Sequence, residues 1–128
     1  MNNIVSCPCG LPHKYQDCCG RFISGADTPT TAEQLMRSRY SAFVAEEEGY
    51  LVKTWHPDTR PSEVSINPSQ RWLGLSVENC IDGGPDDHTG TVEYVARFKI
   101  AGQGSRLHET SRFEKIDGSW YYRDGDHH

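Results

Sequence analysis

Four of the chain's five cysteines lie within thirteen consecutive positions, as the close pairs Cys7/Cys9 and Cys18/Cys19. A loop that carries one pair of thiolates at each end can supply the four tetrahedral ligands that Zn²⁺ prefers. The spacing therefore predicts one structural zinc ion per chain, bound by Cys7, Cys9, Cys18 and Cys19. Because the protein would fill all four coordination positions, such a site would stabilise structure and would not activate water.

Two oxidised alternatives stay open for the same cysteines: two disulfides, or a redox-active cysteine pair. Adjacent cysteines do not easily bridge to each other, and disulfides are rare in the cytoplasm. Residues 1–5 lack the basic and then apolar pattern of a signal peptide, and no apolar stretch approaches the roughly 20 residues of a membrane span. We therefore expect a cytoplasmic protein that does not enter the membrane, and this location favours zinc.

The net charge bears on the kind of partner. The 128-residue chain has the size of one ordinary globular domain and a formal net charge of −5. Residues 1–26 contain Lys14, Arg21 and Asp17, a sum of +1, which leaves −6 for residues 27–128. Non-specific nucleic-acid binding depends on the neutralisation of phosphates by basic residues. An acidic body therefore disfavours nucleic acid as a partner.

A helical pattern follows the cysteine region. Thr30 has Glu33 three positions on, the spacing of a capping box, so we expect a helix to begin there. Gly49 is expected to bend or divide this helix before Trp55, and His56-Pro57 is expected to end it. The apolar residues that recur three or four positions apart are Leu35, Met36, Tyr40, Phe43, Val44 and Leu51.

After residue 69 the apolar period changes from about 3.6 to 2, which is typical of β-strands. The predicted inward residues are Leu73, Leu75, Val77 and Ile81 in one strand and Val92, Tyr94, Ala96, Phe98 and Ile100 in the next. A third run, residues 106–116, is joined to Trp120 by Asp117-Gly118, a pair suited to a tight hairpin turn. Cys80, in the first of these strands, is expected to be a packing residue. Helices followed by antiparallel strands indicate an α+β fold, with the helices on one face of a curved sheet.

Several segments resemble a known family. The N-terminal segment is similar to the SEC-C motif, the zinc-binding segment at the C-terminus of the SecA translocation ATPase. The similar residues are 7–10, 14–15 and 18–20. The rest resembles the YchJ-like family of bacterial SEC-C proteins at residues 35–43, 50–57, 72–75 and 119–122. The resemblance implies a SEC-C zinc motif in residues 1–26 and an NTF2-like (cystatin-type) α+β domain in residues 27–128. It implies no particular reaction.

The cysteine segment departs from the family pattern in its charge. Gly10 is followed by Leu11-Pro12-His13-Lys14 where Ser-Gly-Lys-Lys is usual, and Gln16-Asp17 stand where two lysines are frequent. The finger is therefore less basic than its family pattern, which weakens the expectation of a protein partner on the finger and leaves the metal ligands intact. The residues placed to offset the charge of four thiolates are His13, Lys14 and Arg21.

An NTF2-like fold leaves a conical cavity between its sheet and its helices, so polar residues on the inward register are candidates for a second site. If alternation holds, Glu109 and Ser111 share a strand face with Leu107 and Phe113. A desolvated carboxylate there could act as an acid or a base, as in ketosteroid isomerase, a relative by fold. The structural alternative is a salt bridge from Glu109 to Arg37, Arg39 or Arg97 across the interior.

Two further positions are candidates for the same cavity. Arg37 and Arg39 stand two positions apart on a helix, so they cannot point the same way, and one of them could bind an anion in the cavity. His56 stands beside Trp55 near the expected mouth, where it could act with Tyr121 or Asp124 or simply cap the helix. The candidates are thus Glu109 and His56 for catalysis, and Arg37, Arg39, Trp55, Arg97 and Ser111 for ligand binding.

Two classes of function lead, and a third, a nucleic-acid-binding finger, is the one that the acidic body disfavours. The first is a non-enzymatic, zinc-stabilised binding or adaptor protein whose finger docks on a macromolecular partner or on the adjacent domain. The second is a small-molecule enzyme or ligand binder that uses the cavity. An enclosed pocket with convergent polar groups would favour the second class.

Overall fold

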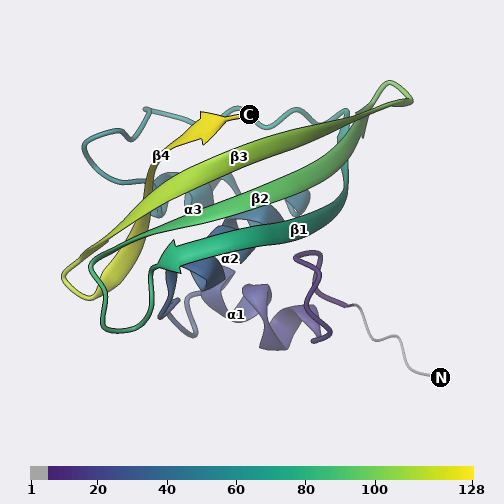
Figure 1. Cartoon of the computed structure of the whole chain (residues 1–128). Coiled ribbons are helices and arrows are strands. Elements are labelled where there is room, and N and C mark those ends of the chain that lie inside the picture. The colour runs from purple at the N-terminus through teal and green to yellow at the C-terminus, as the bar shows by residue number, and fades with distance from the viewer. Residues whose placement is uncertain (1–5) are drawn as a thin grey trace.

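The structure is a computed structural model that describes residues 6–128. Residues 1–5, which belong to the predicted finger and to the expectation about a signal peptide, lie outside the described residues. The predicted α+β class is confirmed, because long antiparallel strands curve over a layer of helices (Figure 1). The elements are a 3₁₀ turn η1 (Tyr15–Asp17), helices α1 (Cys19–Ile23), α2 (Ala32–Val44) and α3 (Glu48–Lys53), and strands β1 (Gln70–Asp82), β2 (Thr89–Ile100), β3 (Gln103–Ile116) and β4 (Ser119–His127).

Helix α2 begins one residue later than predicted. Its N-cap is Thr31, whose side chain accepts a hydrogen bond of 3.1 Å from the backbone N–H of Gln34. The Gln34 side chain accepts in turn from the backbone N–H of Thr30 at 2.8 Å. The cap therefore resembles a capping box in which Gln34, and not Glu33, bonds back, although to the residue before the N-cap.

The division of the helical region also differs from the prediction. Glu46, with a φ of 57°, lies in the left-handed region between α2 and α3, while Gly49 lies inside α3. The backbone N–H of Glu47 bonds to the carbonyl of Ala42 at 2.8 Å, which closes the C-terminal end of α2. Gly49 as the dividing residue is therefore wrong. Helix α3 ends at Lys53, three residues before His56-Pro57.

The sheet has the order β1-β2-β3-β4, with every neighbouring pair antiparallel. The predicted alternation holds in β2 at Val92 and Ala96, which are buried, but Ile100 at the end of the strand is 38% exposed, so its predicted inward placement is wrong. In β1 the pairing with β2 shifts between Trp72 and Gly74 and again between Val77 and Asn79. Trp72 therefore faces the core, while Leu73 and Ile81 are each 57% exposed, so their predicted inward placement is wrong.

The turn between β3 and β4 confirms the sequence prediction. Asp117 and Gly118 have φ angles of 49° and 85° and connect Ile116 directly to Ser119. Positive φ at both central residues is the geometry of the turn that matches the twist of a hairpin. Cys80, in contrast, is exposed, so its predicted packing role is wrong.

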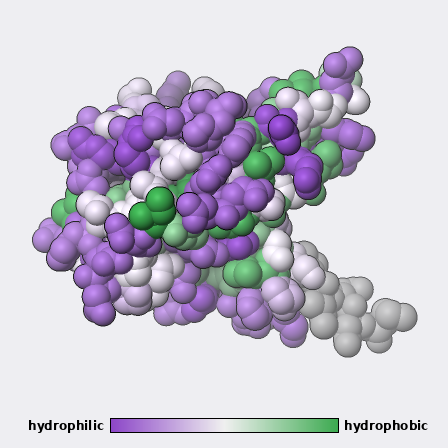
Figure 2. Space-filling model, in the orientation of Figure 1, coloured by the Kyte–Doolittle hydropathy of each residue, from purple (hydrophilic) through white to green (hydrophobic). Residues whose placement is uncertain are grey.

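Two apolar clusters hold the layers together. The first lies between α2 and the sheet and contains Leu35, Met36 and Phe113; the second contains Phe22 of α1 together with Tyr50 and Leu51 of α3. The face shown in Figure 2 is mostly hydrophilic, and its apolar residues form small separate groups. Within residues 6–128, no helix is long and apolar enough to cross a membrane.

Candidate metal centre and cavity

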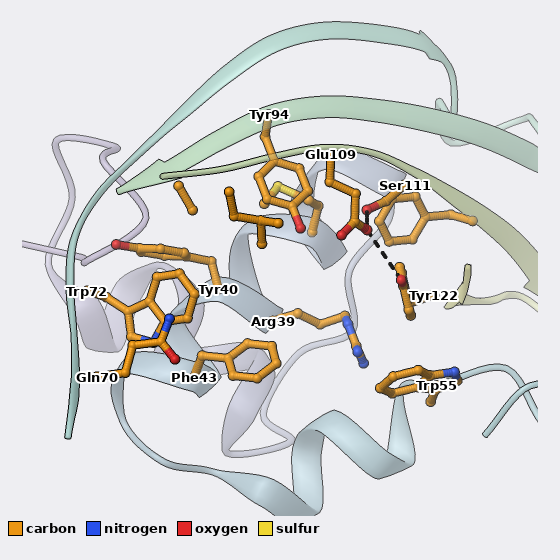
Figure 3. A pocket seen from close by; sticks show the side chains of 14 residues that line it. Arg39, Tyr40, Phe43, Trp55, Gln70, Trp72, Tyr94, Glu109, Ser111 and Tyr122 are labelled. Carbon is orange, nitrogen blue, oxygen red and sulfur yellow. Dashed lines mark hydrogen bonds between the residues drawn. The ribbon is translucent and has the colours of Figure 1, made fainter. Parts of the chain in front are cut away.

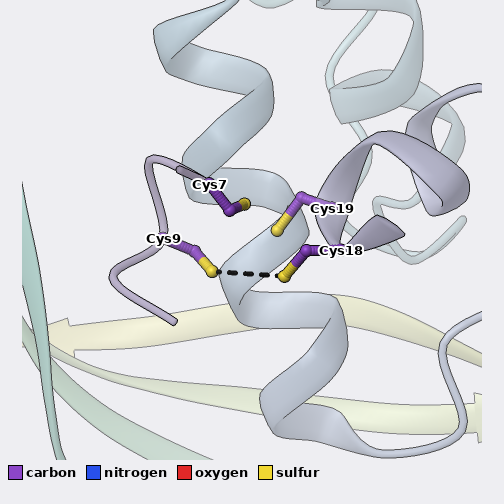
Figure 4. A group of neighbouring side chains, drawn as sticks. All are labelled: Cys7, Cys9, Cys18 and Cys19. Atoms are coloured by element: carbon purple, nitrogen blue, oxygen red, sulfur yellow. Dashed lines mark hydrogen bonds between the residues drawn. The ribbon is translucent and has the colours of Figure 1, made fainter. Parts of the chain in front are cut away.

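The four N-terminal cysteines converge on one point beside α2 (Figure 4). Cys7 and Cys9 come from the loop before η1, Cys18 follows η1, and Cys19 opens α1. The four thiols are free and buried, and their sulfur atoms all lie within 4.8 Å of one another. The predicted ligands therefore form one compact cluster.

The geometry of this cluster fits a thiolate-bound metal. The Sγ atoms of Cys9 and Cys18 are 3.7 Å apart. A tetrahedron of sulfurs around zinc with bonds of about 2.3 Å places the sulfurs about 3.8 Å apart. The separation is too long for a disulfide, whose S–S bond is about 2.05 Å. The cluster is thus suited to a metal ion.

The thiols of the cluster differ in their pKa values. Hydrogen bonding by the thiol of Cys19 lowers the pKa of Cys9 to about 5, although burial opposes the shift. Burial, together with the neighbouring thiols, raises the pKa of Cys18 to about 12. In the metal-free cluster these shifts favour a thiolate at Cys9 and a protonated thiol at Cys18 at neutral pH. A metal ion would replace these thiol protons, because only thiolates are good ligands.

The cysteine loop is seated on α2. Arg37 of α2 donates a 2.6 Å hydrogen bond to the carbonyl of Cys9, and Cys7 Sγ lies 3.6 Å from Ser41 Oγ. Of the basic residues predicted to offset the thiolate charge, Arg21 bonds to the carbonyl of Cys18 at 3.2 Å. His13 and Lys14 are exposed. The guanidinium of Arg37 is therefore a cation near the cluster that the sequence did not assign.

A second feature is a cavity of about 300 Å³ between α2 and the sheet (Figure 3). Aromatic side chains gather at one end, and polar groups from α2, β3 and β4 gather at the other. The largely apolar lining residues are Met36, Tyr40, Phe43, Trp72, Ala96, Leu107 and Phe113, and those with polar groups are Arg39, Trp55, Gln70, Tyr94, Glu109, Ser111 and Tyr122. The cavity thus has the apolar walls and few convergent polar groups that are typical of ligand sites.

Arg39 is the cation of this cavity. It is only 7% exposed, and burial lowers its pKa to about 10, so it remains protonated at neutral pH. Its NH1 atom donates to the carbonyl of Leu51 at 2.8 Å and to Thr54 Oγ1 at 2.7 Å. Its guanidinium carbon lies 5.1 Å from the ring centroid of Trp55 and 4.7 Å from that of Tyr122. These contacts fix the guanidinium between two aromatic rings.

Glu109 supplies the carboxylate. Its Oε2 atom accepts hydrogen bonds from Ser111 Oγ at 2.6 Å and from Tyr122 OH at 3.2 Å, and Glu109 is only 5% exposed. Burial and then the charge of Glu109 raise the pKa of Tyr122, which keeps its hydroxyl protonated as a donor. Among residues 6–128, no ion pair joins Glu109 to an arginine. The salt bridge considered from the sequence is therefore absent from the described chain.

The structure separates the other candidates from the cavity. Arg37 points to the cysteine loop, and Arg97 is exposed on β2, so neither lines the cavity as expected. His56 is buried outside it, with Nε2 3.4 Å from Glu114 Oε1 and 3.4 Å from Arg123 NH1. The contacts of His56 are thus with Glu114 and Arg123 and not with Tyr121 or Asp124, the partners considered from the sequence, and they join the segment after α3 to β3 and β4.

Only Arg39, Trp55, Glu109 and Ser111 of the lining residues were assigned to a site from the sequence, so Trp72, Gln70, Tyr94 and Tyr122, among others, were missed. Gly74 within a strand pattern was the available signal for Trp72, since a glycine there often marks a bulge that reverses the inward face. Tyr122 alternates inward with Trp120, but its hydroxyl contact with Glu109 depends on the pairing of β3 with β4, which local periodicity does not determine.

The sequence comparisons agree with this fold. Residues 31–125 match a family described as the YchJ middle NTF2-like domain. A UPF0225 protein of Bordetella parapertussis is 54% identical, and the match covers 95% of this chain and 92% of that protein. A UPF0225 protein of Streptomyces avermitilis is 51% identical, with 95% and 84% covered.

Two solved structures are similar along nearly the whole chain. A SEC-C motif-containing protein from Rhodopseudomonas palustris is 32% identical with a TM-score of 0.84, and the match covers 95% of this chain and 98% of that one. A SEC-C motif-containing protein from Psychrobacter arcticus is 33% identical with a TM-score of 0.79, and 94% and 81% are covered. The cysteine cluster and the cavity therefore lie in a fold that this chain shares with both solved structures.

Proposed function

This chain belongs to the family of the YchJ middle NTF2-like domain, and we propose that it is a small-molecule-binding protein stabilised by a zinc-loaded finger. In this proposal residues 1–26 form the finger and residues 27–128 the NTF2-like domain that holds the cavity. The cavity is the functional site, and the metal centre is structural.

The single observation that carries the proposal is the composition of the cavity. A space of about 300 Å³ is lined mainly by aromatic and aliphatic side chains, yet it contains the buried cation Arg39 and the buried carboxylate Glu109 without an ion pair between them. Buried charges that are retained only for stability are normally paired. Glu109 Oε1 lies 3.4 Å from His127 Nε2, whereas Arg39 pairs with no carboxylate among the described residues, so its buried charge is better explained by a ligand that contacts it.

The contacts of the finger support a structural role for its metal. The loop with Cys7 and Cys9 is bonded to Arg37 and Ser41 of α2, and Phe22 of α1 packs with Tyr50 and Leu51. These contacts support the proposal that the finger docks on the adjacent domain, beside the helix that supplies Arg39. Four thiolates around zinc leave no open coordination position for chemistry. Reduced cysteines of this kind also favour a cytoplasmic location.

Metal analysis tests the zinc assignment. We expect elemental analysis of protein purified without added zinc to find one zinc ion per chain. The variant Cys9→Ser should bind less zinc, and the matched variant Cys80→Ser, which changes an exposed cysteine outside the cluster, should bind as the unchanged protein does. Protein without metal, or equal zinc content in both variants, would contradict the assignment.

A cavity-filling substitution tests the ligand site. The probes are 2-naphthoate, 2-naphthamide and 2-naphthylmethylamine, which share one ring system and differ in charge. Leu107→Trp places an indole in the cavity, and the control Leu73→Trp places it on an exposed position. We expect at least one probe to shift amide resonances of cavity residues in wild type and in Leu73→Trp, but not in Leu107→Trp. Binding by none of the probes, or binding unaffected by Leu107→Trp, would overturn the proposal.

Glu109 favours a second candidate function, that of an enzyme that moves protons. Its carboxylate lies in the cavity and is held by the hydroxyls of Ser111 and Tyr122, so it could take a proton from a carbon next to a carbonyl and return it to the same ligand. The test is hydrogen–deuterium exchange of the methyl protons of 2-acetylnaphthalene in D₂O, followed by proton NMR. Catalysed exchange that is lost in Glu109→Gln supports an enzyme, whereas a rate equal to that of buffer leaves a binding protein.

A further inference from the structure

Arg39 is a buried cation without a carboxylate partner in residues 6–128. Its NH1 atom is used in hydrogen bonds to α3, while its Nε and NH2 atoms donate to no protein group in the described part of the chain. A charged group removed from water costs several kcal/mol unless an opposite charge and hydrogen bonds compensate for it. Neighbouring peptide and hydroxyl groups supply only part of this compensation.

The free donors of Arg39 have a defined direction. The rings of Trp55 and Tyr122 cover the guanidinium, and NH1 ties one side to α3. The edge formed by Nε and NH2 therefore remains for a ligand. Two parallel N–H donors on a planar fork match the two oxygens of a carboxylate. The oxygen Oε2 of Glu109 is already engaged by Ser111 and Tyr122.

The opposite end of the cavity indicates what kind of group the rest of the ligand contains. Tyr40 and Phe43 lie with ring centroids 5.6 Å and 5.9 Å from that of Trp72, so three aromatic side chains surround this end (Figure 3). Aromatic rings stack or meet edge to face at centroid distances of this size. A flat ring would therefore find partners there, and a volume of about 300 Å³ suits a small molecule.

We propose that the ligand is a small ring-bearing carboxylate, with its ring among Tyr40, Phe43 and Trp72 and its carboxylate on the Nε and NH2 atoms of Arg39. This assignment rests on the proposed function, since it names the chemical class that the same cavity takes. Glu109 lines the same cavity at its polar end, where Oε2 is held by Ser111 and Tyr122 and Oε1 lies 3.4 Å from His127 Nε2.

Calorimetric titration of the zinc-loaded full chain tests the assignment with 2-naphthoate and its neutral analogue 2-naphthamide. We expect the acid to bind wild type at least about tenfold more tightly, because hydrogen bonds between charged groups are roughly twice as strong as those between neutral groups. Arg39→Gln should remove this preference and leave the affinity for the amide within about threefold. Arg97→Gln removes the same charge from an exposed position and should preserve the preference.

The outcomes separate this inference from the function it rests on. If the amide or 2-naphthylmethylamine binds in the cavity as tightly as the acid, the protein is a ligand binder and the assignment to carboxylates is wrong. If no probe binds, the proposed function itself fails. Arg39→Gln also removes the hydrogen bonds to Leu51 and Thr54, so this variant could fail to fold. In that case the ratio of acid to amide affinity in wild type decides whether the ligand is a carboxylate. An equal loss of acid affinity in Arg97→Gln would show a general charge effect and overturn the role of Arg39.

Discussion

At the scale of single residues, Gly125 shows how the fold makes room for the carboxylate of the cavity. Gly125 pairs with Ser111, and a Cβ at this position would overlap the carboxylate of Glu109 and lie 2.8 Å from its Cδ. Its φ is not positive, so the backbone conformation does not require glycine. The space next to Gly125 is therefore what permits the inward position of Glu109.

The substitution Gly125→Ala should destabilise the protein by about 1–3 kcal/mol, the usual cost of overpacking a core. The matched control is Gly104→Ala, since a Cβ there meets no atom within 4 Å. Urea unfolding measures both changes. The cost of Gly125→Ala should largely vanish in a Glu109→Ala background, and an equal cost in both backgrounds would contradict the proposed overlap.

Cys80 has a prediction that depends on its pKa. Burial, followed by the nearby charge of Glu33, raises this pKa to about 11, and Cys80 Sγ lies 3.5 Å from Glu33 Oε1. At pH 8 the thiol is therefore protonated and should react slowly with iodoacetamide. Glu33→Gln lowers the pKa and should accelerate alkylation a few-fold in zinc-loaded protein, as measured by mass spectrometry. The exposed Glu63→Gln is the control, and equal rates in the two variants would exclude an influence of Glu33.

The residues also show what the sequence could and could not predict. Period-2 alternation placed Glu109 and Ser111 on the inward face, where the structure has them, because β3 is regular through these positions. The spacing of Arg37 and Arg39 predicted that their side chains point in different directions. It did not predict which of the two enters the cavity. That choice depends on the cysteine loop, which docks on the side of Arg37.

At the scale of elements, α2 connects the two features of the molecule. Arg37 faces the cysteine loop and Arg39 faces the cavity, from positions two residues apart on one helix. The start of this helix was misplaced by one residue because Thr30 and Thr31 are both good caps. The break after α2 was missed because glutamate is an unusual residue for the positive φ of Glu46.

The cap of α2 gives a prediction at this scale. Thr31→Ala removes the hydrogen bond to the backbone N–H of Gln34 and should cost about 1 kcal/mol of unfolding free energy. Thr30→Ala removes the hydroxyl of an exposed residue that bonds only to the side chain of Gln34, so it should cost less. Chemical denaturation compares the two variants. A larger effect of Thr30→Ala would show that the cap lies where the sequence first suggested.

At the scale of the whole molecule, the metal centre and the cavity lie on two sides of the same helix. The general α+β order followed from the change in apolar period, and the metal cluster followed from cysteine spacing. The cavity could not be predicted in detail, because its lining comes from α2, the segment after α3 and all four strands, in a register that two bulges in β1 alter.

Loss of the metal should therefore weaken ligand binding at a distance. In Cys9→Ser the finger loses a ligand and its hold on α2, so we expect lower stability towards urea and a several-fold weaker affinity for 2-naphthoate. Cys80→Ser should change neither property. If Cys9→Ser is less stable but binds the probe as well as Cys80→Ser does, the finger stabilises the fold without shaping the cavity.

The most direct measurement of the central claim is a crystal structure of the zinc-loaded chain with 2-naphthoate. We predict density for one metal ion among Cys7, Cys9, Cys18 and Cys19, and density for the naphthyl ring beside Trp72 with its carboxylate on Arg39. An empty cavity at saturating probe, or a probe bound only on the outer surface, would contradict the claim that this cavity is the functional site.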